Sequence, residues 1–185
     1  MVPRTSGCGS SAAERRVDRL FEPIPRIAYV ALGSNVDPQR HVPLALATLR
    51  RLWPDLEVAP MFVTASLGPD NQPDGKPDFW NTVLRFTTAW NPTTVRAALR
   101  RIEHLVGRRR DGERYAPRSL DLDLLLLGDL IDSGLPHRDL QRYPFVRWPL
   151  ALLDPERQPP YAMVPIRTQS LRLGDPLHLP EPLAL

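Results

Sequence analysis

Two aspartates separated by a single residue, Asp121 and Asp123, are the feature of the sequence best suited to chemistry. They fall in a leucine-rich run, residues 119–127 (SLDLDLLLL), whose initial alternation predicts a strand. Because side chains two apart on a strand share a face, the two carboxylates lie side by side and repel each other unless a cation sits between them. Mg²⁺ prefers such oxygen ligands and shares them with substrate phosphates, so a phosphate-bound magnesium pair is one interpretation. Two solvated acids on an open sheet face are the other.

Positive charge is concentrated just before these acids. Residues 96–118 hold eight arginines against three acidic residues, and the resulting local charge of +5 exceeds the net charge of +3 of the whole chain. An anionic ligand is therefore expected there. The arginines nearest the acids are Arg108, Arg109, Arg110, Arg114 and Arg118. Phosphoryl transfer relies on neutralisation of phosphate by metal and arginine, which this segment would supply, although a solvated loop or a nucleic-acid contact would use the same charge.

Three aromatic or amide residues and one histidine are further candidates. His137, with Asp139 two residues after it, could bind a phosphate oxygen or donate a proton, and the alternative is a structural histidine. Phe79, Asn81 and Phe145 could form a slot for a flat heterocycle, with two stacking faces and an amide that offers a donor and an acceptor. Phenylalanine at strand positions is also the usual core residue. The sequence has no P-loop, no G-x-G-x-x-G motif and no serine–histidine–aspartate pattern.

The elements that must position these residues follow from hydrophobic periodicity. We expect strands at residues 26–32, 57–64, 78–88 and 119–127. We expect one helix that Asp37 and Pro38 open and Pro54 stops, a second from Pro92 to Gly107, and short helical pieces within 136–143 and 146–153. Residues 66–77 and 108–117 are too rich in breakers or charge for a regular element and predict two lid-like loops. The order strand, helix, strand, strand, helix, strand predicts a ferredoxin-like split βαβ domain of the α+β class, one antiparallel sheet with helices packed on one face.

Length and composition set the class of protein. The chain has 185 residues, of which 42% are apolar, and this fits one domain at residues 23–185 behind a disordered extension at residues 1–22. The tail from Gln158 is proline-rich and predicts strand fragments and turns. Cys8 is the single cysteine, which excludes a disulfide framework and favours a reducing cytosol. No apolar run approaches the roughly 20 residues of a membrane helix, and no signal peptide is present, so we expect a cytoplasmic monomer without a membrane partner.

Seven segments, taken in order, carry a family resemblance. They are residues 31–35 (ALGSN), 67–69 (LGP), 77–81 (PDFWN), 101–103 (RIE) with 107–108 (GR), 114–123 (RYAPRSLDLD), 135–137 (LPH) and 145–150 (FVRWPL). Together they resemble the bacterial 6-hydroxymethyl-7,8-dihydropterin pyrophosphokinases over residues 26–155. The R-x-x-P-R-[ST]-L-D-[IL]-D block is the most specific part of this match.

The resemblance implies an activity and a role for each matching residue. The activity is transfer of pyrophosphate from magnesium-bound ATP to the hydroxymethyl group of a reduced pterin in folate synthesis, with attack at the β-phosphorus and release of AMP. Two Mg²⁺ ions would bind Asp121 and Asp123, which with Arg108, Arg118 and His137 would form the catalytic group. The implied ATP contacts are Arg108, Arg110, Arg118 and His137. The implied pterin contacts are Thr64, Leu67, Phe79, Asn81, Tyr115 and Phe145.

Two departures from the family pattern lie on the ATP side. The family commonly has a basic residue before the L-x-x-P-H stretch, but residues 131–134 contain none, and this segment is shorter than usual. Tyr143 stands where the family has an arginine, although Arg142 is next to it. A non-catalytic or weakly active pterin-binding relative is therefore the alternative function. A third hypothesis is a ferredoxin-like RNA-binding module, but the strands lack exposed aromatic pairs and the carboxylate pair would repel phosphate. We therefore expect ATP and a pterin as partners and no nucleic acid.

Overall fold

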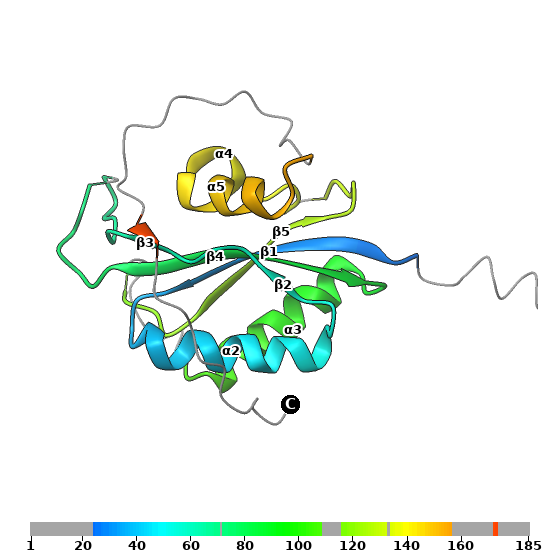
Figure 1. Ribbon diagram of the computed structural model, residues 1–185, viewed down its shortest axis with the longest axis horizontal. Coiled ribbons are helices and arrows are strands. Elements are labelled where there is room, and N and C mark those ends of the chain that lie inside the picture. Colours follow the sequence, from blue (N-terminus) through cyan, green and yellow to red (C-terminus); the bar gives the residue numbers. More distant parts are fainter. Residues whose placement is uncertain (1–23, 71, 109–115, 133, 157–171, 174–185) are drawn as a thin grey trace, which may run out of the picture.

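Short runs of branched and aromatic residues form the strands of one antiparallel sheet in the computed structural model (Figure 1). The structure describes residues 24–70, 72–108, 116–132, 134–156 and 172–173. The strands are β1 (Arg26–Ser34), β2 (Glu57–Val58), β3 (Phe62–Thr64), β4 (Phe79–Thr88), β5 (Asp121–Leu127) and β6 (Arg172–Leu173). Their order is β5-β1-β4-β3-β6, with β2 also paired to β4. The long strands β1 and β4 are therefore central, and β5 lies beside β1.

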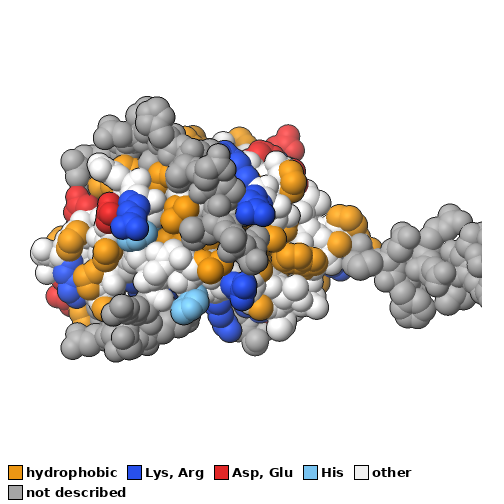
Figure 2. All heavy atoms as spheres, turned by 90° about the horizontal axis from the view of Figure 1, so that it is seen from below, with side chains coloured by type: hydrophobic (Ala, Val, Ile, Leu, Met, Phe, Trp, Pro, Cys, Tyr) orange, Lys and Arg blue, Asp and Glu red, His pale blue; other side chains and the backbone are white. Residues whose placement is uncertain are grey.

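Two long helices cover one face of this sheet. They are α2 (Pro38–Leu52) and α3 (Pro92–Leu105). Asn91 caps α3, because its side chain accepts a hydrogen bond from the Thr94 amide at 2.9 Å, and Pro92 occupies the first turn. Gly107 ends the helical segment with a φ of 96°, which favours glycine. On the surface seen from below, the basic side chains of the described residues stand in separate groups, one of them beside acidic side chains (Figure 2).

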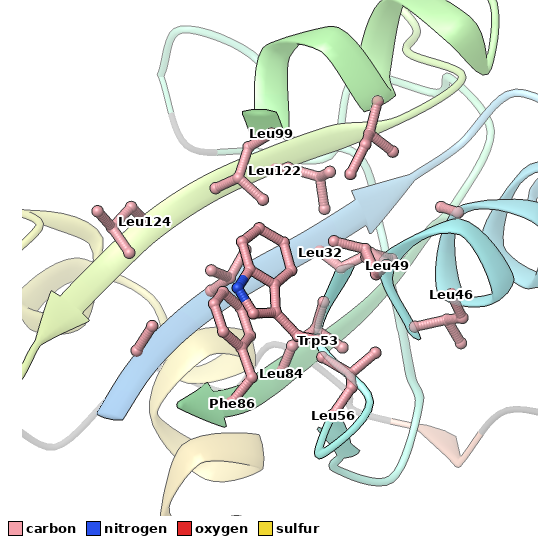
Figure 3. Packing of buried hydrophobic residues seen from close by; sticks show 14 of the residues in the cluster. Leu32, Leu46, Leu49, Trp53, Leu56, Leu84, Phe86, Leu99, Leu122 and Leu124 are labelled. Carbon is pink, nitrogen blue, oxygen red and sulfur yellow. The ribbon is translucent and has the colours of Figure 1, made fainter. Parts of the chain in front are cut away.

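The larger core lies between these helices and the sheet. Leu32, Leu84 and Leu122 come from three neighbouring strands and pack with residues of α2 and α3 (Figure 3). Trp53, just after α2, stacks on Phe86 of β4 with ring centroids 4.0 Å apart. The other labelled residues of this cluster in Figure 3 are Leu46, Leu49, Leu56, Leu99 and Leu124. Burial of this face holds the sheet against α2 and α3.

A second helical layer lies on the opposite face of the sheet. It consists of α4 (Asp139–Arg142) and α5 (Pro144–Leu153), which lie above the sheet in Figure 1. A separate cluster of buried residues joins this layer to the strands: Tyr29, Val83, Leu125, Leu126, Leu140, Val146 and Leu150. The expectation that the helices pack on one face is therefore wrong. The central strands carry apolar residues on both faces, and such strands require cover on both.

Other boundaries differ from expectation in ways that matter for the site. The expected strand at 57–64 is divided into β2 and β3, since Pro60 between them has no amide hydrogen to continue the ladder. Strand β1 continues to Ser34, which brings Gly33 inside the sheet. The remaining expected helices and strands are confirmed with small shifts at their ends.

Within the described ranges, no helix combines the length and apolar character needed to cross a bilayer. The predicted extension at 1–22, most of the tail and residues 109–115 of the second loop lie outside the described residues.

Candidate active site

Three neighbouring strands place polar residues in one row. In the sheet register, Gly33 of β1 lies opposite Asn81 of β4 on one side and Asp121 of β5 on the other. Two residues along the strands, Ala31 lies opposite Asp123. A Cβ at Gly33 would come within 3.1 Å of the Asn81 Oδ1 atom. The small residues of β1 therefore leave an open floor between the amide and the two carboxylates.

A cavity of about 500 Å³ opens over this row. This volume is large enough for small-molecule ligands. The cavity brings together every predicted site residue that the structure describes: Thr64, Leu67, Phe79, Asn81, Arg108, Arg118, Asp121, Asp123, His137 and Phe145. The other two predicted site residues, Arg110 and Tyr115, lie outside the described residues. Sequence positions more than 80 residues apart are thus joined in one cavity by strand pairing.

Two arginines hold the carboxylate of Asp121. Arg108 donates from Nη1 to Oδ1 at 2.5 Å, and Arg118 donates from Nη1 to Oδ2. Arg108 also donates to the buried carboxylate of Glu103 on α3, and Glu103 accepts the Leu122 amide hydrogen at 2.8 Å. Burial disfavours the charged form of Arg108, but Asp121 and Glu103 outweigh this effect and raise the pKa of the guanidinium above its ordinary value. The network therefore ties α3 to β5 and keeps Arg108 charged at the cavity.

Asp123 has a different environment from Asp121. Among the described residues, no arginine or lysine forms an ion pair with its carboxylate. Burial raises its pKa, the nearby charge of Asp121 raises it further, and His137 only partly opposes them, so that the pKa is about 6. The expected face-sharing of the two acids is confirmed, since Leu122 and Leu124 point into the larger core while both aspartates line the cavity. One acid of the pair is neutralised by arginine and the other is open to a cation.

An irregularity in β5 positions His137. The register with β1 shifts so that Leu124 and Leu126 face consecutive residues, Val30 and Tyr29, and Leu125 is the extra residue of a bulge. The Leu125 carbonyl accepts the His137 amide hydrogen at 2.9 Å. The turn before α4 is thereby fastened to the strand that carries the aspartates, and the imidazole lines the same cavity.

Amide side chains organise the other half of the site. Asn81 donates from Nδ2 to the Thr64 hydroxyl at 2.9 Å, which leaves its carbonyl oxygen toward the cavity floor beside Gly33. The Asn35 side-chain oxygen accepts the Arg118 backbone amide hydrogen at 2.7 Å, and the Asn35 backbone amide donates to the Arg118 carbonyl at 3.0 Å. These two backbone-directed bonds fix the segment from which the Arg118 side chain reaches Asp121.

Aromatic rings flank the cavity. Phe79 comes from β4 and Phe145 from α5, and both line the cavity. Phe145 stacks on Tyr143 with ring centroids 4.9 Å apart and planes 15° from parallel. The tyrosine that replaces an expected arginine thus supports a ring of the cavity, and the neighbouring Arg142 also lines it.

Three residues near the site were given no role from the sequence: Asn35, Glu103 and Asp139, the last of which also lines the cavity. From the sequence, Glu103 was counted only as a charged residue of the second helix. Asn35 was noted only as part of the ALGSN segment, and Asp139 only as a neighbour of His137. An acid at 103 between apolar residues 102 and 106 was the available signal, because a charge on a buried helix face requires a partner. For Asn35 and Asp139 the sequence carries no comparable signal.

Comparisons with known proteins show which sequences the chain is similar to. Residues 29–155 match the family model described as 7,8-dihydro-6-hydroxymethylpterin-pyrophosphokinase. The chain is 40% identical over 164 residues to a 2-amino-4-hydroxy-6-hydroxymethyldihydropteridine pyrophosphokinase of Pseudomonas aeruginosa, covering 84% of this chain and 89% of the relative. A protein of the same name from Haemophilus influenzae is 35% identical over 66% of this chain and 78% of the relative. The folic acid synthesis protein fol1 of Schizosaccharomyces pombe is 31% identical over 77% of this chain but only 20% of its own length.

Proposed function

The chain belongs to the 7,8-dihydro-6-hydroxymethylpterin-pyrophosphokinase family, and we propose from this premise how its own residues carry out the transfer. The protein is an ATP-dependent pyrophosphokinase of folate biosynthesis that acts on a pterin. The single observation that carries the site assignment is the row of Asn81, Gly33 and Asp121 across three strands. It supports one cavity in which a heterocycle lies over the amide and a phosphate chain lies over the acids.

The phosphate end of the site is assigned to arginine, histidine and carboxylate groups. Arg108 and Arg118 line the cavity and donate hydrogen bonds to Asp121. A rotation of their side chains would replace the carboxylate with phosphate oxygens as the acceptors of these bonds. His137 is proposed to contact the phosphate chain, and so is Arg110, which lies outside the described residues. Fixed positive groups of this kind stabilise the charge that develops during phosphoryl transfer.

Asp121 and Asp123 fit a hard divalent cation. Both are carboxylates on one strand face, and Asp123 has a raised pKa and no arginine partner among the described residues. We propose that this pair holds two Mg²⁺ ions with the phosphates of ATP. When bound, such ions neutralise the phosphate chain and orient it for in-line attack.

The pterin end is assigned to the row beyond Gly33. The Asn81 amide, held by Thr64, would hydrogen-bond the ring, and backbone groups near Leu67 would complete the slot. Phe79 and Phe145 are proposed to bind the two faces of the ring, because aromatic stacking adds to the burial of a flat heterocycle. Tyr115, outside the described residues, would close over it.

The reaction then requires a hydroxymethyl oxygen at the β-phosphorus of ATP. The hydroxymethyl oxygen forms a bond to the β-phosphorus, and the bond from that phosphorus to the oxygen shared with the α-phosphorus breaks. AMP leaves with that oxygen, and the hydroxyl proton passes to solvent. Alignment of the two reacting groups in one cavity accounts for much of the rate gain expected of such a site.

Product identity tests the proposal. Incubation of the full-length protein with ATP, MgCl₂ and 6-hydroxymethyl-7,8-dihydropterin should form AMP and the pterin pyrophosphate in equal amounts. Release of ADP alone, or of no nucleotide product, contradicts it. Pterin binding without AMP would instead select the non-catalytic relative, and omission of the pterin is the matched control for ATP hydrolysis.

Three further properties belong to the same proposal. We propose one catalytic domain at residues 23–185 with a dispensable extension at 1–22, a monomer, and a cytoplasmic location in keeping with the lone Cys8. No nucleic-acid partner is proposed, because the acids on the sheet face would repel phosphate in the absence of cations. Sedimentation of the full-length protein, and activity after removal of residues 1–22, test the first two properties.

A further inference from the structure

A second group of possible metal ligands lies at the α4 end of the cavity. It consists of Asp123, His137 and Asp139, and one ligand atom from each lies within 4.8 Å of the other two. These residues come from β5, from the turn before α4 and from the first residue of α4. Asp121 is not part of this group. The group therefore differs from the pair of acids assigned to the phosphate-bound ions, although the two share Asp123.

Backbone contacts hold this group in place without help from a ligand. The His137 amide hydrogen is bound by the Leu125 carbonyl at 2.9 Å, and the His137 carbonyl accepts the Leu140 amide hydrogen at 3.1 Å. The Asp139 carbonyl accepts the Tyr143 amide hydrogen at 3.0 Å. A site whose ligands are positioned by the backbone loses little conformational freedom when an ion binds.

Charge also favours a cation at this position. The Asp139 carboxylate has Oδ1 3.8 Å from Arg138 Nε, while Oδ2 lies 3.6 Å from Nδ1 of His137. One oxygen is thus turned toward the imidazole and away from the arginine. Arginines neutralise Asp121 but not Asp123 among the described residues. Two carboxylates and one imidazole supply the ligand atoms, and the negative charge of the carboxylates is what a divalent ion would balance.

The ligand types indicate which ion this is. Mg²⁺ takes oxygen ligands almost exclusively, whereas imidazole nitrogen suits Zn²⁺ and Co²⁺. We propose that Asp123, His137 and Asp139 form a nucleotide-independent site for a borderline divalent transition ion such as Zn²⁺. Binding of the ion does not depend on the transfer activity. One consequence does rest on the proposed function: the ion occupies Asp123 and His137, so it competes with magnesium-bound ATP.

Cobalt binding tests the site directly. The full-length protein, freed of metal by a chelator that is then removed, is titrated with CoCl₂ in excess MgCl₂ and without nucleotide, and the visible absorption of Co²⁺ is followed. A saturable spectrum that ZnCl₂ abolishes is expected. Asp139→Asn and His137→Gln should each weaken Co²⁺ binding at least about tenfold, whereas the control Asp121→Asn should change it less than about threefold. Circular dichroism checks that each variant is folded. If Asp139→Asn does not fold, Co²⁺ binding by His137→Gln decides the question.

Two results would overturn the inference. One is the absence of saturable Co²⁺ absorption in the wild-type protein, which would leave direct contacts between the His137 imidazole and the two carboxylates as the explanation of the cluster. The other is loss of binding in Asp121→Asn with retention in Asp139→Asn, which would place the ion on the neighbouring pair of acids. The competition is tested separately: ZnCl₂ should raise the KM for MgATP in the AMP-forming assay. Zn²⁺ binding in a protein that forms no AMP would refute the proposed function and leave the site standing.

Discussion

Substitution of Asp123 by asparagine should stabilise the metal-free protein, whereas the same substitution at Asp121 should not. The two acids are neighbours on one strand face, but Asp121 is held by Arg108 and Arg118. Asp123 has no such partner among the described residues and lies beside the charge of Asp121. Asp123→Asn removes a repelled, partly buried charge, while Asp121→Asn removes the charged partner of two arginines.

The pKa of Asp123 sets the size and the sign of this effect. The carboxyl titrates at about 6 in the folded chain against an ordinary value of 3.8, so the folded state holds the proton more tightly than the unfolded state. Between pH 3.8 and about pH 6, the free energy of unfolding falls as pH rises, and above about pH 6 it stays lower by the full amount. A shift of this size corresponds to at most about 3 kcal/mol, and partial access of water makes a gain of about 1–2 kcal/mol the expected result for Asp123→Asn at neutral pH.

Chemical denaturation in EDTA measures the difference. At pH 7.5, Asp123→Asn should raise the free energy of unfolding, and near pH 4 the gain should disappear because the wild-type carboxyl is protonated in the folded state. Asp121→Asn, the matched control, should lower the free energy of unfolding by about 1–2 kcal/mol, since it leaves hydrogen-bonded arginines without a charged acceptor. If both variants lose stability equally at pH 7.5, the electrostatic account of the pair is wrong.

Three other predictions follow from the same contacts. Gly33→Ala should weaken pterin binding about tenfold, or about 1.4 kcal/mol, because the new Cβ approaches Asn81 Oδ1 to 3.1 Å; calorimetric titration checks this, and unchanged affinity contradicts it. Glu103→Gln should lower the unfolding free energy by about 1–3 kcal/mol and reduce kcat/KM, because Arg108 loses a buried charged partner; an unaltered melting curve would show that the network is dispensable. Activity that depends on Mg²⁺ should fall below about pH 6 as Asp123 takes up a proton, and excess Mg²⁺ should move that midpoint to lower pH; a profile indifferent to Mg²⁺ would assign the titration to another group.

Local patterns were sufficient for much of the fold. The alternation of residues 119–124 predicts that Asp121 and Asp123 share a face, and the structure confirms this because the strand period depends only on the backbone. The helix after Pro92 was predicted from one apolar stripe and a proline start, and both are local signals. The family motifs added the identity of the site residues, ten of which line one cavity.

Contacts between distant segments were not accessible in the same way. The second helical layer was missed, because α4 is one turn long and the leucines of β5 do not indicate which helix covers which face. The bulge at Leu125 that fastens His137 depends on the register of β5 against β1. The role of Glu103 depends on Arg108 turning back toward β5.

By itself, the sequence determined which residue types were present, which of them shared a strand or helix face, and which family they resembled. The tertiary structure alone decided that Asn81, Gly33 and Asp121 lie in one row, that arginines neutralise Asp121 but not Asp123 among the described residues, and that His137 and Asp139 join Asp123. The physical reason is that the periods of a helix and a strand arise within one segment, whereas register, burial and charge pairing arise between segments and depend on how the whole core packs.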